Sequence, residues 1–220
     1  DPDQLPSIPS ILREEENAIA ASVEYEEYPD HLRHFGNNVY SASFSNLYSA
    51  PRNQILLREH FRSHPLIIGF SNLNIYHKKY KKPLLIKNGR KYSNEDDGLS
   101  YIQVAGEARR PDQGSGWINQ IEAQKVISVM HDIKANEINR SMSIGIVTPY
   151  RKQVDLITDE LTRANLIGGV SVGTAHTYQG QEKDIMIFSP VVSKGIDENS
   201  ALWISKPPNL LNVALTRARR

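Results

Sequence analysis

The sequence predicts an α/β domain built on a mainly parallel sheet, and two observations support this prediction. Short runs rich in isoleucine and valine alternate along the chain with longer segments whose apolar residues recur at helical spacing. Apolar runs with little polar alternation suit strands that are covered on both faces, as in parallel sheets. Strands that alternate with helices in this way are joined by right-handed crossovers.

The apolar runs give the predicted strands, which are residues 55–57, 99–104, 143–147, 170–174 and 185–192. The periodic segments give the predicted helices, which are residues 8–23, 65–80, 119–135, 150–164 and 210–219. Ser10 can cap the first helix, and Pro65 suits the first turn of the second. Polar residues follow several strands, where ligands bind in open parallel sheets.

Composition narrows the classes of function. The 220 residues suffice for one large domain, with or without a small appendage. The net charge is +1, so a nucleic acid would have to be recognised by a local groove. The absence of cysteine excludes disulfides and cysteine nucleophiles and fits the reducing cytoplasm, where we expect this protein. No apolar run is long enough to cross a bilayer, and the abrupt ends suggest a piece of a longer protein.

Self-sufficient nucleotide hydrolysis is not expected from these 220 residues. The chain has no G-x-x-x-x-G-K-[ST] phosphate loop and no Asp-Glu pair after a strand that would hold magnesium. Four polar clusters nevertheless stand out, at residues 1–6, 60–65, 179–184 and 212–219. Each alone has a simple explanation, because a single arginine on a protein surface is usually just solvated.

In this order, the clusters resemble the motifs of superfamily 1 helicases, in particular the branch that contains the nonsense-mediated-decay RNA helicase. Residues 1–6, DPDQLP, resemble motif III, and residues 60–65, HFRSHP, resemble the segment usually written Q-Y-R-M-H-P. Residues 144–153, IGIVTPYRKQ, match I-G-V-I-T-P-Y-x-x-Q, while residues 172–184 and 211–219 match motifs V and VI. The resemblance covers nearly the whole chain. His60 and Ser63 depart from the pattern, which has glutamine and methionine there.

The resemblance implies a RecA-like, P-loop NTPase-type three-layer domain. Residues 1–38 would form the motif III loop with a connecting helix or insertion, and residues 39–220 the second RecA-like domain. The longer protein would be an ATP-dependent helicase. ATP with Mg²⁺ would sit against an N-terminal RecA-like domain that holds the metal, so this chain alone would be inactive. The expected partners are that domain and single-stranded DNA or RNA.

Three residues receive roles at the terminal phosphate from this resemblance. Gln4 would sense the γ phosphate, while Arg62 and Arg217 would reach it across the interdomain cleft as arginine fingers. Arginine suits this role because it stays charged and offers a planar fork of donors to phosphate oxygens.

Three further residues would bind the nucleoside. Glu182 would accept a hydrogen bond from the ribose, and Gly180 would allow close backbone approach. Phe61 replaces the more usual tyrosine and could stack near the adenine.

The resemblance places two strand ends against the nucleic-acid backbone. The candidate contacts are Thr148, Tyr150, Arg151, Gln153, Thr174, His176 and Thr177. Hydroxyls, amides and a cation hold phosphates without reading sequence. For some of them a simpler explanation remains open: Thr148 could shape a turn, and His176 could be a hydrogen-bonded structural histidine.

Other features have structural explanations. The basic run between residues 78 and 91 is expected to be a solvated helix end, and Trp117 and Trp203 are expected to be packing residues. Two alternatives to a motor domain remain at this stage. One is a nucleic-acid-binding module whose arginines bind the strand, and the other is an interaction domain whose motifs only preserve the fold.

Overall fold

The computed structural model describes residues 11–22, 33, 57–87, 98–205 and 209–219, and it divides the chain into two compact units, residues 1–57 and 58–220. In the first unit the described helix is α1, Arg13–Ser22, which lies within the predicted range. The backbone N–H of Leu12 donates to Glu15 Oε2 over 2.7 Å. Acidic residues in this first turn also complement the positive end of the helix.

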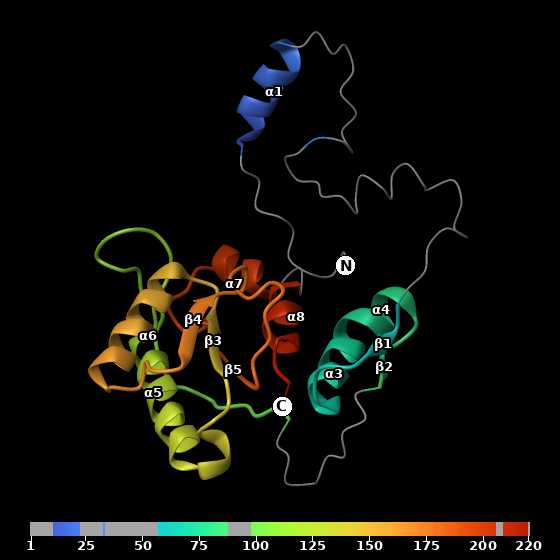
Figure 1. The fold of residues 1–220 in the computed structure, drawn as a ribbon. Coiled ribbons are helices and arrows are strands. Elements are labelled where there is room, and N and C mark those ends of the chain that lie inside the picture. The colour runs from blue at the N-terminus through green and yellow to red at the C-terminus, as the bar shows by residue number, and fades with distance from the viewer. Residues whose placement is uncertain (1–10, 23–32, 34–56, 88–97, 206–208, 220) are drawn as a thin grey trace. The chain divides into compact units, whose positions relative to one another are not determined.

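The second unit is built around a three-stranded parallel sheet (Figure 1). Strand β3, Ile144–Thr148, lies between β4, Val170–Thr174, and β5, Ile185–Phe188, and pairs in parallel with both. Every residue of β3 is buried. This confirms the predicted parallel sheet, and the absence of polar alternation in β3 follows from its central position.

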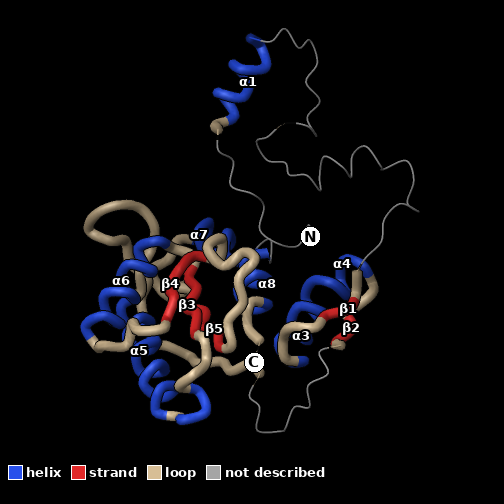
Figure 2. Tube along the Cα trace, in the orientation of Figure 1, coloured by secondary structure: helices blue, strands red, loops and turns tan. Residues whose placement is uncertain are grey.

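Helices cover both faces of this sheet, as Figures 1 and 2 show. Helices α5, Gln120–Ala135, and α6, Arg151–Arg163, lie on one side, and α6 contacts β3 and β4. The buried core beneath them comprises Ala123, Val126, Met130, Ile144, Ile146, Ile157 and Leu161. Helix α8, Asn209–Thr216, contacts β5 on the other side and is joined there by α7, Glu198–Ser205. The result is the three-layer arrangement that the sequence predicted.

The predicted helix over residues 65–80 forms with one irregularity. Helix α3, Pro65–Ser71, continues through a π-helical turn η3, Asn72–Tyr76, into α4, His77–Tyr80. Lys81 then adopts the left-handed conformation at φ 56° and ends the helix. A separate two-stranded parallel sheet pairs β1, Glu59–His60, with β2, Leu85–Ile86. Helix α3 packs against α8, which brings this region to the main sheet.

Several predictions of elements were wrong. Residues 99–104 form no strand, and Tyr101 is 88% exposed, because no neighbouring strand pairs with this apolar run in the part of the chain that the structure describes. Of the strand predicted at residues 55–57, only Leu57 is described; it is exposed and is not in a strand. Strand β5 ends at Phe188 instead of residue 192. Helix α7 was not predicted.

The two tryptophans differ. Trp117 is buried with Ala108 and Val191, as predicted, and its Nε1–H donates to Ser200 Oγ over 2.9 Å. Trp203 is 51% exposed and contacts the ring of Tyr150 at a centroid separation of 5.8 Å, so its packing is only partial. No helix among the described residues is long and apolar enough to cross a membrane.

Candidate functional site

Three segments far apart in the sequence meet beside α8. The loop that joins β4 to β5 is fixed by Tyr178, which is 1% exposed and donates its hydroxyl hydrogen to Ser171 O over 2.5 Å. Gly145 makes room for the side chains packed there, because a Cβ would lie 2.5 Å from Met186 Sδ and 3.1 Å from Tyr178 Cε1. The chain after α8 then pairs with the end of the same loop: Lys183 N–H donates to Arg217 O over 3.0 Å, and Arg219 N–H donates to Lys183 O over 3.0 Å.

This pairing aligns two acidic and two basic side chains. Glu182 and Asp184 flank Lys183, and Arg217 and Arg219 flank Ala218, its bridge partner. Side chains two residues apart on an extended chain point to the same side. The predicted helix over residues 210–219 was therefore too long, because α8 ends at Thr216 and both arginines follow it.

Arg62 completes a chain of ion pairs that we call the arginine–carboxylate network: Arg62, Glu182, Arg219 and Asp184. Arg62 Nε–H donates to Glu182 Oε1, and Arg62 Nη1–H donates to Thr216 O over 3.2 Å. Arg219 Nε lies 3.1 Å from Glu182 Oε2, and its Nη1 lies 3.4 Å from Asp184 Oδ1. The structure thus joins the loop before α3 to the β4–β5 loop and to the segment after α8.

Both carboxylates of the network are kept ionised. Burial acts to raise the pKa of Glu182, but hydrogen bonds and charge from Arg62 and Arg219 outweigh it and hold that pKa below its ordinary value. The pKa of Asp184 is lowered chiefly by the hydrogen bond from the Ser143 hydroxyl, with Arg219 contributing. Carboxylates in this state are pure acceptors that can orient guanidinium groups.

Arg217 lies next to this network and is only 7% exposed. Burial lowers the pKa of Arg217, and the nearby positive charge of Arg62 lowers it further, while Glu182 acts in the opposite direction. Arginine remains charged despite such a shift. The fold therefore holds two guanidinium groups close together at one edge, an arrangement that an anion would stabilise.

The loop before α3 surrounds Arg62 with residues of several kinds. The backbone N–H of Ser63 donates to His60 Nε2 over 2.8 Å, so this imidazole is an acceptor at that nitrogen. Burial lowers the pKa of His60 from its ordinary value of 6.5, and the charges of Arg62 and Arg217 lower it further. Phe61 is 62% exposed, which leaves its ring available for stacking.

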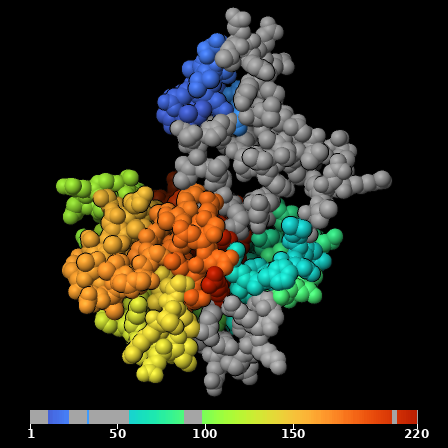
Figure 3. All heavy atoms as spheres, in the orientation of Figure 1, coloured from blue at the N-terminus to red at the C-terminus, as the bar shows by residue number. Residues whose placement is uncertain are grey.

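The structure brings together three of the predicted nucleotide-site residues, Arg62, Glu182 and Arg217. Gly180 belongs to the same β4–β5 loop at φ +78°, a backbone conformation that favours glycine, with open space beside its Cα. Gln4 lies outside the described residues. In Figure 3 red atoms of the C-terminal residues reach the surface between the orange and cyan segments.

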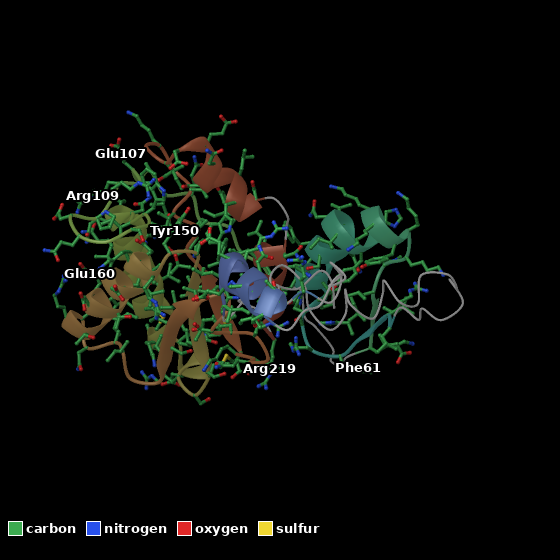
Figure 4. The ribbon with its side chains drawn as sticks, turned by 90° about the horizontal axis from the view of Figure 1, so that it is seen from above. Phe61, Glu107, Arg109, Tyr150, Glu160 and Arg219 are labelled. Carbon is green, nitrogen blue, oxygen red and sulfur yellow. The ribbon has the colours of Figure 1, made fainter. Side chains whose placement is uncertain are left out.

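The predicted nucleic-acid residues divide into exposed and buried groups. Thr148 and Thr174 are neighbours in the register of β3 and β4, which brings the two strand ends together. Arg151 and Thr177 are exposed, whereas Tyr150, Thr174 and His176 are half-buried. Figure 4 shows Tyr150 well away from Arg219, so this member of the set lies apart from the arginine–carboxylate network.

Two members of the predicted nucleic-acid set need correction. Gln153 is fully buried: its Oε1 accepts from Asn119 N–H over 2.9 Å, and its Nε2 lies 3.2 Å from Asn119 O and 3.3 Å from Ser189 Oγ. Its amide is committed to holding α6 against the start of α5, so no surface remains for a strand. Thr148 is also fully buried, at the end of β3.

Sequence reasoning missed Arg219, Asp184 and Ser143. The spacing of Glu182 with Asp184, and of Arg217 with Arg219, is the signal that could have identified paired, alternating segments. Ser143 precedes β3, and its hydroxyl donates to Asp184 Oδ2 over 2.7 Å. Nothing in a single sequence places Ser143 beside Asp184, which lies 41 positions away.

Comparison with known proteins agrees with this architecture. A family model described as an AAA domain matches residues 40–220. The chain belongs to this family, as a domain of the superfamily 1 helicases in the branch of the nonsense-mediated-decay RNA helicase. Both the family and the RecA-like fold predicted from the sequence are thereby confirmed.

Several of the curated relatives are named as helicases. The chain is 32% identical over 133 residues to putative helicase MOV-10 of Gallus gallus, covering 53% of this chain and 14% of the relative. It is 31% identical over 166 residues to the DNA replication ATP-dependent helicase/nuclease DNA2 of Gallus gallus, which covers 75% of this chain and 16% of that relative. It is 26% identical over 193 residues to the regulator of nonsense transcripts 1 homolog of Arabidopsis thaliana, which covers 80% of this chain and 15% of that relative. The chain thus matches only a small part of each relative's length.

Proposed function

We propose that this chain is the second motor domain of an ATP-dependent superfamily 1 helicase, which supplies arginine fingers and part of a single-strand groove. The observation that carries the proposal is the meeting of Arg62, Glu182 and Arg217 beside α8, although they come from three segments far apart in the sequence. Packing alone does not require two guanidinium groups and a carboxylate to lie together, because clustering them costs more desolvation free energy than leaving each charge exposed to solvent.

The arrangement fits the terminal phosphate of ATP. Arg217 is nearly buried, and the positive charge of Arg62 beside it lowers its pKa, so a phosphate would relieve the repulsion between them. Both would donate to phosphate oxygens, and Arg62 would do so through its Nη groups while its Nε–H stays on Glu182. Arginine fingers in phosphoryl transfer accelerate hydrolysis by roughly 10³ to 10⁵.

The remaining nucleotide contacts are assigned from the family's motifs. Glu182 would accept a hydrogen bond from the ribose, Gly180 would admit the backbone to close range, and Phe61 would stack near the adenine. Gln4 would sense the γ phosphate. ATP supplies the phosphoanhydride bond when it is bound, and the domain that carries the phosphate loop would hold Mg²⁺. The described residues contain no cluster of histidine, aspartate and glutamate suited to a metal.

The strand side of the proposal rests on the exposed ends of β3 and β4. Arg151, Thr177 and the half-buried Tyr150, Thr174 and His176 would bind the phosphodiester backbone of single-stranded DNA or RNA. Such contacts fix the position of a strand without reading its bases. Gln153 and Thr148 would act indirectly, by holding these strand ends in shape. The enzyme would work in the cytoplasm, which suits a chain without cysteine.

The test separates motor from binding functions in a protein that contains both this chain and the phosphate-loop domain. Arg62→Ala and Arg217→Ala should each lower kcat for ATP hydrolysis by about 10³-fold, while affinity for single-stranded nucleic acid changes by less than about 3-fold. Arg163→Ala is the matched control, because Arg163 is an exposed arginine paired with Glu160 on α6. Retained hydrolysis with lost strand binding would instead establish a binding module without motor activity.

A further inference from the structure

We propose that Arg219 is a positioning residue of the ATPase site. It holds the Glu182 carboxylate in the orientation in which that carboxylate holds Arg62. This inference rests on the proposed motor function, and it assigns a role to a residue outside the set predicted from the motifs.

The geometry of Glu182 gives the first reason. Its two oxygens are divided between two arginines: Oε1 accepts from Arg62 and Oε2 accepts from Arg219. Because the carboxylate is a rigid plane, a rotation that moves Oε2 away from Arg219 also moves Oε1 relative to Arg62. Removal of Arg219 would therefore leave Arg62 attached to a carboxylate that is free to turn.

The anchoring of Arg219 gives the second reason. Its Nη1 lies 3.4 Å from Asp184 Oδ1, and the other oxygen of Asp184 accepts from the Ser143 N–H over 2.9 Å and from the Ser143 hydroxyl over 2.7 Å. Asp184 N–H also donates to Ser143 O over 3.0 Å. Ser143 immediately precedes β3, so the network ends on the central strand of the sheet. Groups held by a rigid element are positioned more accurately than groups held by loops.

The chemistry favours arginine at this position. Nε and Nη1 of one guanidinium serve two different carboxylates, and the planar fork fixes the angle between them. A lysine ammonium would keep the charge without that angle. The side chain of Arg219 is 39% exposed and those of its partners are 31% and 29% exposed, so these ion pairs add little to stability. The main effect of Arg219 is therefore on the orientation of the Glu182 carboxylate.

The kinetic test uses the protein that contains both motor domains. Arg219→Gln should lower kcat for ATP hydrolysis on the order of 10- to 100-fold, as expected for a displaced catalytic group, with a smaller change in KM. The thermal midpoint should change by less than ~4 °C. Arg219→Lys should recover part of kcat, and Arg163→Gln, the matched control on α6, should leave kcat unchanged.

A double variant tests whether Arg219 affects kcat through Glu182. In a Glu182→Gln protein the effect of Arg219→Gln should shrink to less than about 2-fold, because two residues that act through one group are non-additive. An undiminished effect in that background would overturn the proposal, since it would mean that Arg219 acts on ATP or on the strand directly.

An NMR measurement on the chain itself keeps this inference separate from the motor proposal. Arg219→Gln should raise the titration midpoint of the Glu182 carboxyl and shift the Arg62 Nε–H resonance, whereas Arg163→Gln should change neither. If both signals are unaffected, the positioning role is wrong even if Arg62→Ala abolishes hydrolysis. If both respond while Arg62→Ala leaves hydrolysis intact, the coupling stands and the motor proposal fails.

Discussion

Two polar networks in this domain each contain a glutamate, but they differ in charge and in burial. The arginine–carboxylate network is charged, partly exposed and lies at the edge where three segments meet. The second, which we call the buried amide network, consists of Asn119, Glu122, Gln153 and Ser189. It joins the start of α5 to α6 and to the chain after β5, and all four residues are buried.

Glu182 and Glu122 make the contrast explicit. Two arginines hold the pKa of Glu182 below its ordinary value, whereas burial raises the pKa of Glu122. Glu122 Oε1 accepts from the Ser189 hydroxyl over 2.6 Å and from Val191 N–H over 3.0 Å, and both of these donors are neutral. Val191 has φ +64°, a strained conformation for a β-branched residue, which this hydrogen bond helps to hold. The arginine–carboxylate network is partly exposed and can be reached from solvent, while the buried amide network fixes the scaffold.

The largest effect that would sharpen this comparison is a loss of stability at Gln153. Gln153→Ala should lower the free energy of unfolding by about 2 to 3 kcal/mol, because the buried Asn119 N–H loses its acceptor, and Asn119 O and Ser189 Oγ each lose one hydrogen bond. Urea unfolding of the chain measures this change. Gln124→Ala, an exposed position on α5, should stay within about 0.5 kcal/mol. Equal small effects at both positions would contradict the structural role of Gln153.

A smaller effect concerns the pH dependence of the arginine edge. His60 must stay neutral to accept from Ser63 N–H, and Arg62, Arg217 and Glu182 are the charged groups that act on it. Its pKa lies below 6.5 in the folded chain, so the unfolded chain binds more protons below that pH. Stability and hydrolysis should therefore both decline as the solution is acidified below about pH 6.5.

His60→Gln tests this explanation. The glutamine amide oxygen can accept from Ser63 N–H and does not titrate, so the acid limb of kcat/KM between pH 5 and 7 should flatten by a few-fold. A profile that superimposes on that of the unchanged protein would show that another group produces the limb. His77→Gln is the matched control, because His77 is exposed on α4.

The smallest effect compares two basic positions on the surface. Arg151→Ala should weaken binding to single-stranded nucleic acid by about 1 kcal/mol and reduce the slope of log affinity against log salt by roughly 1. Lys79→Ala should change neither, because Lys79 belongs to the exposed end of α4 and lies 5.1 Å above the ring of Tyr80. Equal losses of affinity at both positions would indicate that the strand binds at the basic run between residues 78 and 91 as well.

Local pattern was enough for β3, β4, α5 and α6. Strand β4 begins and ends where the apolar run does, and α5 begins after Asn119, whose side chain accepts from Glu122 N–H. Hydrophobic runs failed where pairing partners decide the outcome. Residues 99–104 have the composition of a buried strand, yet Tyr101 and Ile102 are exposed. Apolar composition favours a strand, but only a neighbouring strand can satisfy its backbone.

The candidate site shows the same division. The order of the motifs identified Arg62, Glu182 and Arg217, which the fold brings together. These residues could be found because the residue type at each motif position can be read from the sequence. The same motif order placed Gln153 on the surface, and the fold buries it. Arg219 was overlooked because its value depends on Asp184 and Ser143, which only the tertiary structure brings within reach.

The central claim is that Arg62 and Arg217 act on the terminal phosphate of ATP. The most direct measurement is a structure of the longer protein with ADP and aluminium fluoride, which mimics the transferring phosphoryl group. The claim predicts guanidinium nitrogens of both residues within about 3 Å of the fluoride ligands. A complex in which both arginines stay beyond about 6 Å from the fluoride would contradict it.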